Sequence, residues 1–254
     1  MIPWLSENTP FPPVENALRA PNGLLAAGGD LSAPRLLDAY RHGIFPWFNP
    51  GDPVLWWCPD PRMVLIPQEF KISRSLARVL RNAACEVRCD TAFEQVMRSC
   101  AAPRGSHHGT WIHEDMIASY CKLHEMGYAH SVEVWMPKKL FPLQIEGEAK
   151  RQSSLAERPE MELSGGLYGV TIGRMFYGES MFSNASNASK IALAHLARQL
   201  ERWCFGMIDC QMKTSHLASL GAREISRSEF IYRLQELIHY APVTDWQFDT
   251  DLFS

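Results

Sequence analysis

The segment from Gly166 to Trp203 constrains the fold of this chain more than any other. Two apolar runs, GLYGVTIG and RMFYGESMF, meet at Gly173 and predict two antiparallel strands joined by a tight turn. A helix-like run, IALAHLARQLERW, follows a short polar stretch, and its apolar residues share one face of a helix at about 188–203. Strands and helices also alternate elsewhere after Pro61.

Six further elements are predicted from periodicity and from end signals. Thr91 and Glu94 form a capping box at the start of one helix, and Gly127 ends the next. Ser226, three residues before Glu229, opens the last helix of the chain. Besides this last helix, the predicted elements are the helices at 73–82, 91–100 and 114–126 and the strands at 129–135 and 207–212.

The first sixty residues differ from the rest because they are rich in proline, glycine and aromatic residues. They contain one predicted helix, which starts at Ser32, has Pro34 in its first turn and ends at Gly43. We therefore expect either a small N-terminal domain or a lid at 1–60 that leans on a larger domain at 61–254.

Residues 136–164 break the alternation of elements. The run PKKLFPLQIEGEAKRQSSLAERPEMELS contains ten charged residues and follows neither a helical nor a strand period. This composition predicts a surface insertion between two neighbouring strands, mobile at its centre.

Length, charge and cysteine content exclude several classes of protein. The 254 residues are 46% hydrophobic and 21% charged, as in an ordinary soluble protein, and the net charge of −3 argues against a general nucleic-acid binder. No run approaches the roughly 18 apolar residues of a membrane span, and the start MIPWLSENTPFPP lacks the features of a signal peptide. The seven cysteines show no C-x-x-C spacing, so we expect reduced thiols, no metal site and a cytoplasmic location.

One predicted helix carries a basic edge. Arg74, Arg78 and Arg81 recur at i, i+4 and i+7, opposite an apolar stripe. Such an edge is either a solvated surface or a surface that binds phosphates, and the spacing alone favours the first.

Polar residues gather where the second strand of the pair precedes the helix, in GESMFSNASNASK. Ser186, Asn187 or Ser189 can cap the helix, and such a junction can also bind a ligand. Ser180 and His216 would allow a catalytic triad with an aspartate, but no G-x-S-x-G motif accompanies them.

A second set of polar residues lies in the strand MIDCQM. Strand alternation places Asp209 and Gln211 on the same face. They either satisfy a structural hydrogen bond or face a pocket that Glu179 also reaches. Two carboxylates and an amide without a nucleophile suit the orientation of an attacking group better than covalent catalysis.

Nine short motifs occur in order along the chain: GIFPWF, WWCPDPR, GTWI, AHSVEVW, GGLYGV, GESMFS, NASK, IDCQ and HLASLGA. This series resembles that of the bacterial leucyl/phenylalanyl-tRNA–protein transferases, over nearly the whole chain outside 136–164. The resemblance implies transfer of Leu or Phe, with Met as a further candidate, from charged tRNA to the N-terminal Arg or Lys of a protein, which marks that protein for degradation. It also implies an α/β (α+β) fold, with an acetyltransferase-like (GNAT-like) mixed-sheet domain and a small N-terminal domain, and no cofactor. We expect a monomer.

The resemblance further implies roles for individual residues. Asp209 assists the incoming amine through Gln211, and Glu179 lies in the same pocket. Trp47 and Trp111 hold the terminal adenosine of the tRNA, and the basic helix binds the phosphates of its acceptor stem. The other substrate-binding residues are Phe176, Ser180, Met181, Leu193 and Ile208, of which all but the serine form an apolar slot for the Leu or Phe side chain.

Two features leave alternatives open. Thr214 occupies a position where the resemblance implies asparagine, so the corresponding contact is left open. Residues 144–149 match the Q-x-x-G-x-A loop of acyl-CoA-dependent N-acyltransferases, which is the alternative function. Two glutamates within this match would repel a diphosphate.

Overall fold

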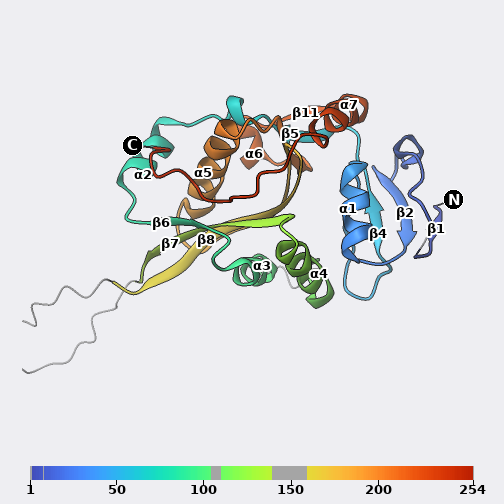
Figure 1. The fold of residues 1–254 in the computed structure, drawn as a ribbon, viewed down its shortest axis with the longest axis horizontal. Helices are drawn as coiled ribbons and strands as arrows, with labels where there is room; N and C mark the ends of the chain where they lie inside the picture. The colour runs from blue at the N-terminus through green and yellow to red at the C-terminus, as the bar shows by residue number, and fades with distance from the viewer. Residues whose placement is uncertain (1, 8, 104–109, 139–158, 254) are drawn as a thin grey trace, which may run out of the picture.

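The computed structural model describes residues 2–7, 9–103, 110–138 and 159–253, and its strands form two sheets (Figure 1). The strands of the smaller sheet are β1 (Trp4–Leu5), β2 (Leu24–Gly28), β3 (Phe45–Pro46) and β4 (Leu55–Trp57). Those of the larger sheet are β5 (Arg62–Leu65), β6 (Glu86–Cys89), β7 (Ala129–Pro137), β8 (Met161–Ile172), β9 (Met175–Ser183), β10 (Met207–Gln211) and β11 (Arg223–Ile225). The strand orders are β1-β2-β4-β3 and β11-β5-β10-β9-β8-β7-β6.

The helices are α1 (Ala33–Arg41), α2 (Arg74–Asn82), α3 (Phe93–Ala101), α4 (Glu114–Glu125), α5 (Ala188–Arg202), α6 (Ser215–Ser219) and α7 (Arg227–Leu237). They cover both faces of the larger sheet (Figure 1). On one face α5 packs against β7, β8 and β9, and α2 packs against α5. On the other face lie α3 and α4. The predicted α/β fold and the predicted spans are therefore confirmed.

The apolar core under α3 and α4 continues into the smaller sheet. Tyr40 of α1 and Phe45 of β3 belong to the same buried cluster as Tyr120 of α4 and Phe230 of α7. A second cluster lies under α5 on the opposite face of the larger sheet. The N-terminal sixty residues are thus joined to the rest by buried apolar contacts, which contribute about 25 cal/mol for each Å² removed from water.

The predicted antiparallel pair is β8 and β9, and its turn contains Gly173. The φ angle of Gly173 is +60°, and a Cβ atom there would lie 2.3 Å from the carbonyl oxygen of Leu237. Both the turn and the close approach of the end of α7 therefore require glycine.

The insertion predicted at 136–164 is shorter than expected. It does join neighbouring strands, but β7 and β8 stay paired to its edges, where Pro137 lies opposite Met161. Beyond that pair, the N–H of Lys138 donates to the carbonyl oxygen of Glu160 at 2.8 Å. The centre of the segment, including the match at 144–149, lies outside the described residues. Within the described part of the chain, no helix is long and apolar enough to cross a membrane.

The capping box predicted at Thr91 and Glu94 is wrong. The N-cap of α3 is Ala92, which offers no side-chain acceptor. Glu133 of β7 instead accepts hydrogen bonds from the N–H groups of Thr91 and Ala92, at 2.9 and 2.8 Å. Glu94 pairs with Arg98 at the surface. A buried carboxylate from a neighbouring strand satisfies the donors, so the local pattern did not reveal the cap.

Replacing Glu133 by Ala is expected to lower the free energy of unfolding by roughly 3 kcal/mol, because several buried donors lose their acceptor. Replacing Glu94 by Ala breaks only an exposed pair and should cost less than about 0.5 kcal/mol. Urea unfolding followed by circular dichroism measures both changes. Equal costs would indicate that the capping box operates after all.

Candidate active site

Strands β9 and β10 separate partway along their length. Their parallel pairing begins with Met207 opposite Met175 and ends with Asp209 opposite Tyr177, although β9 and β10 both continue. Gln211 has a left-handed backbone with φ of +59°, and the register of β10 against β5 shifts between Asp209 and Gln211. The divergence opens a gap in the sheet into which each strand can direct a polar side chain.

Glu179 of β9 and Gln211 of β10 meet in this gap, as the sequence predicted. The Gln211 amide nitrogen donates to Glu179 Oε1 at 3.1 Å, and the hydroxyls of Tyr40 and Tyr120 donate to Oε1 and Oε2 at 2.8 and 3.2 Å. Burial raises the pKa of Glu179 to about 7; the hydrogen bonds from the two tyrosines oppose this rise in part, and the nearby charge of Asp209 adds to it.

Asp209 forms a buried ion pair with Arg62. Arg62 Nε and Nη2 lie 2.8 and 2.6 Å from the two carboxylate oxygens, and each side chain is 1% exposed. The guanidinium lies between the rings of Phe45 and Phe230, 4.7 and 4.6 Å from their centroids. Burial has the largest effect on the pKa of Arg62 and lowers it, but the charge of Asp209, its hydrogen bonds and smaller contributions together outweigh burial, so the net shift is upward. Arg62 therefore keeps its charge in the folded protein.

The sequence left two roles open for Asp209 and Gln211, a structural hydrogen bond or a place in a pocket, and the structure gives one role to each residue. Asp209 has both oxygens bound by Arg62, and its Oδ1 also accepts the backbone N–H of Gln211 at 2.9 Å. It is the structural member, and it holds the unusual backbone of Gln211. Both residues line the apolar cavity between α5 and the strands, but only Gln211 also lines the aromatic cavity beside it. Ile208 and Cys210 pack on the α5 face.

An apolar cavity of about 360 Å³ lies between α5 and the separating strands. The predicted slot residues all line it, and so do the predicted polar ones: Phe176, Glu179, Ser180, Met181, Leu193, Ile208, Asp209 and Gln211. Cys210 also lines it, but burial raises the pKa of that thiol, which disfavours the nucleophilic thiolate. The volume falls within the range of about 300–1,000 Å³ typical of small-molecule sites.

A second cavity of about 180 Å³ adjoins the first and is lined by aromatic side chains. It brings together Trp47 and Trp111, the predicted adenosine-binding pair. Trp47 is 49% exposed. Its ring packs edge-on against that of Trp57, with the ring centroids 5.6 Å apart. Glu179, Gln211 and Met212 line both cavities. These three residues therefore form a shared wall between an apolar chamber and an aromatic one.

The polar junction before α5 is capped by a residue that was not predicted. Asn187 is the N-cap but has φ of +66° and makes no capping hydrogen bond. Ser183 instead accepts the N–H of Ser189 at 3.2 Å, and Ser186 accepts from the Asn187 side chain. None of the three predicted caps accepts a hydrogen bond from an N–H group of α5 within the described contacts.

Thr214, which stands where the resemblance implies asparagine, has a local structural role. Its hydroxyl oxygen accepts the N–H of Leu217 at 3.2 Å and so caps α6, while the residue also lines the apolar cavity. His216 lies on α6, but Asp209 is bound by Arg62, so this aspartate does not complete a triad with Ser180 and His216.

The predicted basic helix is α2. Ser73 caps it, Leu76 is buried, and Arg74, Arg78 and Arg81 are exposed. Figure 1 shows α2 on the α5 side of the larger sheet, at the end away from the smaller sheet. The structure therefore does not bring these arginines into the gap between β9 and β10.

Three contributors to the site were not predicted: Arg62, Tyr40 and Tyr120. Arg62 had a signal, since it is a charged residue within WWCPDPR that directly opens the apolar run of β5. The tyrosines had none, because their spacing marks them as apolar residues on the inner faces of α1 and α4, and their hydroxyls acquire a role only when those helices pack together.

Comparison with known proteins gives one family. The sequence model described as "Leucyl/phenylalanyl-tRNA protein transferase" matches residues 64–142 and 148–235, and that of its N-terminal domain matches 29–60. The chain is 59% identical over 250 residues to the leucyl/phenylalanyl-tRNA–protein transferase of Nitrosospira multiformis, covering 98% of each chain. It is 61% identical over 237 residues to that of Nitrosomonas europaea, covering 93% of this chain and 91% of the relative. The family model also matches most of residues 136–164, namely 136–142 and 148–164.

The raised pKa of Glu179 predicts that stability depends on pH. In the unfolded chain this carboxyl ionises near its ordinary pKa of 4.5, and in the folded protein near 7. Between these values the unfolded state binds fewer protons than the folded state, so the free energy of unfolding falls as the pH rises. The expected contribution is roughly 3 kcal/mol.

Glu179→Gln should remove this fall, whereas Glu236→Gln, at an exposed position on α7, should follow the wild-type curve. Urea unfolding between about pH 4 and pH 8 measures the difference between the curves. Parallel curves for wild type and Glu179→Gln would mean that Glu179 keeps an ordinary pKa.

Proposed function

The chain belongs to the leucyl/phenylalanyl-tRNA–protein transferase family, and from that membership we propose that it moves Leu or Phe from charged tRNA to the N-terminal Arg or Lys of acceptor proteins. Such a product would be marked for degradation in the cytoplasm. We also propose that the protein acts as a monomer with a small domain at 1–60 and an acetyltransferase-like catalytic domain at 61–254.

The shared wall of Glu179, Gln211 and Met212 is the observation that carries the proposal. The 3′ end of an aminoacyl-tRNA has three parts: an apolar side chain, an ester and an adenosine. An apolar chamber, a polar wall and an aromatic chamber occur here in the same order. The ester carbonyl would therefore lie at Glu179 and Gln211.

The apolar chamber would select the amino acid by its side chain. Phe176, Met181, Leu193 and Ile208 supply aliphatic, aromatic and thioether surface. Burying a Leu or Phe side chain there is worth about 1.5–3 kcal/mol. The flexible Met181 would adapt the chamber to side chains of different shape.

The aromatic chamber would hold the terminal adenosine. Base stacking on an aromatic side chain is worth roughly 1–3 kcal/mol and needs no particular hydrogen-bond pattern. Trp47 and Trp111 offer such surfaces next to the wall. The Trp57 indole N–H donates to the Trp47 carbonyl oxygen at 2.6 Å, which supports the position of the Trp47 backbone.

The reaction needs an amine held against a carbonyl, because the ester of an aminoacyl-tRNA is already activated. A free α-amino group has a pKa of about 8, so part of it is uncharged near neutrality. The Gln211 amide N–H₂ donates to Glu179, which leaves the Gln211 carbonyl oxygen to accept an N–H of the amine. Asp209 would act through Gln211, by fixing its backbone.

The tRNA body would bind through the exposed arginines of α2. Lys and Arg bind phosphates without reading the base sequence, and Arg74, Arg78 and Arg81 form one exposed edge. Their separation from the wall suits this role, because an acceptor stem extends well beyond its terminal nucleotide.

Transfer to a peptide that begins with Arg tests the proposed function. The wild-type protein, incubated with Leu-tRNA or Phe-tRNA, should add one residue, measured as a mass increase. Gln211→Ala should slow the transfer on the order of 100-fold, since the amine loses its acceptor, while tRNA binding stays nearly the same. Gln235→Ala, an exposed change on α7, is the control.

Asp209→Ala is less informative, because a buried unpaired Arg62 costs about 3–5 kcal/mol of stability. A wild-type protein that adds no residue to the peptide would refute the proposed function. Equal loss of tRNA binding and transfer in Gln211→Ala would assign Gln211 to structure instead.

The tRNA-binding role of α2 makes a separate prediction. Alanine at Arg74, Arg78 and Arg81 together should weaken binding of all tRNA sequences alike. The slope of log affinity against log salt should fall by about 0.7–0.9 for each phosphate that the variant no longer neutralises. Arg233→Ala on α7, which removes an arginine paired with Glu229, should leave the slope unchanged. An unchanged slope in the triple variant would place the tRNA surface elsewhere.

A further inference from the structure

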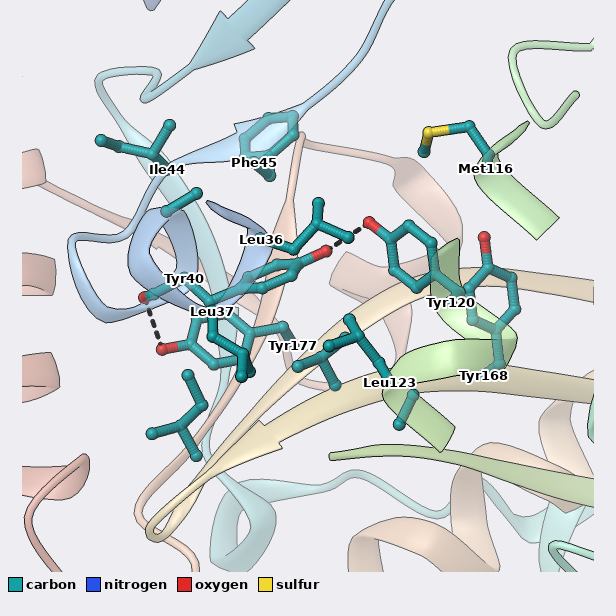
Figure 2. Packing of buried hydrophobic residues seen from close by; sticks show 14 of the residues in the cluster. Leu36, Leu37, Tyr40, Ile44, Phe45, Met116, Tyr120, Leu123, Tyr168 and Tyr177 are labelled. Atoms are coloured by element: carbon teal, nitrogen blue, oxygen red, sulfur yellow. Dashed lines mark hydrogen bonds between the residues drawn. The ribbon is translucent and has the colours of Figure 1, made fainter. Parts of the chain in front are cut away.

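Three oxygen-bearing groups form a closed ring beside the shared wall: the Glu179 carboxyl and the hydroxyls of Tyr40 and Tyr120. Tyr40 lies 2.8 Å from Glu179 Oε1, and Tyr120 lies 3.2 Å from Oε2. The two hydroxyl oxygens are themselves 2.5 Å apart. Figure 2 shows the rings of Tyr40 and Tyr120 pointing their hydroxyls at each other from separate helices.

A count of protons distinguishes the two charge states of this ring. It contains three oxygen–oxygen contacts, and each hydroxyl supplies a single proton. When Glu179 is ionised, two protons serve three contacts, so one contact brings oxygens together without a hydrogen. When Glu179 is protonated, a third proton is present. Glu179 then donates to Tyr120, Tyr120 to Tyr40, and Tyr40 back to Glu179, and every contact is a hydrogen bond.

Because both tyrosines are buried and keep their protons, the ring contains either two or three protons. The side chains of Tyr40 and Tyr120 are 1% and 0% exposed, and burial followed by the charge of Glu179 raises both phenol pKa values well above their usual range. Neither hydroxyl ionises at neutral pH. Glu179 is therefore the member of the ring that gains and loses a proton.

We propose that Tyr40 and Tyr120 are positioning residues that make Glu179 a reversible proton acceptor for peptide-bond formation. This inference rests on the proposed function. It gives Glu179 a role that is distinct from that of Gln211: Gln211 orients the amine, and Glu179 takes its proton.

The step balances as follows. The neutral amine nitrogen attacks the ester carbonyl carbon, and a C–N bond forms. One N–H proton passes to Glu179, which completes the ring of three hydrogen bonds. The C–O bond to the ribose then breaks, and its electron pair stays on the ribose oxygen. That oxygen takes the proton back from Glu179, so the amide and the free ribose hydroxyl form and the carboxylate is restored.

Other groups near the ring determine when Glu179 is ionised. Asp209 on β10 favours the protonated form of Glu179, and Arg62 on β5 favours the ionised form. Gln211 donates to Oε1 without changing its own charge. On β8, the Tyr168 hydroxyl has no hydrogen-bond partner among the described residues and so adds no donor to the ring. The two tyrosines are thus the donors whose removal changes Glu179 most directly.

The test is the dependence of kcat/KM on pH for transfer to an Arg-leading peptide. Tyr40→Phe and Tyr120→Phe each remove a hydroxyl that donates to the carboxylate. Each variant also breaks the ring of the protonated form, but hydrogen bonds to an ionised acceptor are the stronger ones, so the ionised form loses more stability. The acid limb of each profile should move to higher pH by about one unit. The α-amine of the peptide titrates identically with every variant, so the displacement isolates the group on the enzyme.

Tyr177→Phe is the matched control. Tyr177 lies in the same cluster (Figure 2), with its ring 4.8 Å from that of Tyr40, and its hydroxyl donates to the Tyr40 carbonyl oxygen at 2.8 Å. The variant loses a buried hydrogen bond without touching Glu179. Its profile should keep the wild-type acid limb, whatever stability it loses.

A second measurement does not depend on activity. Urea unfolding at several pH values should show that the fall in stability attributed to Glu179 extends to higher pH in Tyr40→Phe and Tyr120→Phe. Acid limbs and unfolding curves that coincide with wild type in both variants would overturn the inference while transfer itself continues. A wild-type protein without transfer would instead refute the proposed function.

Discussion

The ion pair between Arg62 and Asp209 holds the elements of the site in their relative positions. It joins the adjacent strands β5 and β10, and the rings of Phe45 and Phe230 enclose the guanidinium from the smaller sheet and from α7. A buried ion pair is seldom worth more than well-packed apolar residues, because desolvation offsets the attraction. Its effect here is positional, since Asp209 also binds the N–H of Gln211 at the point where β10 leaves its neighbour.

The separation of β9 and β10 converts a packed sheet into a site. While the strands are paired, their side chains fill the core; once they part, Glu179 and Gln211 contact each other and line two cavities. The two backbones are still close where the separation begins, since a Cβ atom on Gly178 would lie in tight contact with the Asp209 carbonyl oxygen, at 3.3 Å. The gap is also dry enough to raise the pKa of a carboxyl to about 7, which matches the range in which an amine changes its charge.

The N-terminal sixty residues complete the site. Tyr40 contacts the Glu179 carboxylate, Phe45 packs against Arg62, and Trp47 lines the aromatic chamber. All three come from α1 and β3 or the loop that follows, at the junction with the larger sheet. A change in the packing of these two parts would therefore alter both the charge state of Glu179 and the shape of the aromatic chamber.

Periodicity and end signals determined most of the secondary structure of this protein, because helices and strands that bury one face leave their period in the sequence. The ordered motifs also identified the family, and strand alternation predicted that Asp209 and Gln211 share a face, whereas the register shift at Gln211 belongs to the folded sheet. Tertiary packing decided the rest. Glu133 caps α3 from a strand that is distant in the chain, Ser183 replaces the predicted caps of α5, and Arg62 neutralises Asp209 from across the sheet. These contacts join polar groups that are distant in sequence, and a buried polar group is satisfied by whichever partner the fold brings near it. The hydroxyls of Tyr40 and Tyr120 are the clearest case, since the sequence marks both residues only as apolar, and their shared contact with Glu179 exists only after α1, α4 and β9 have packed together.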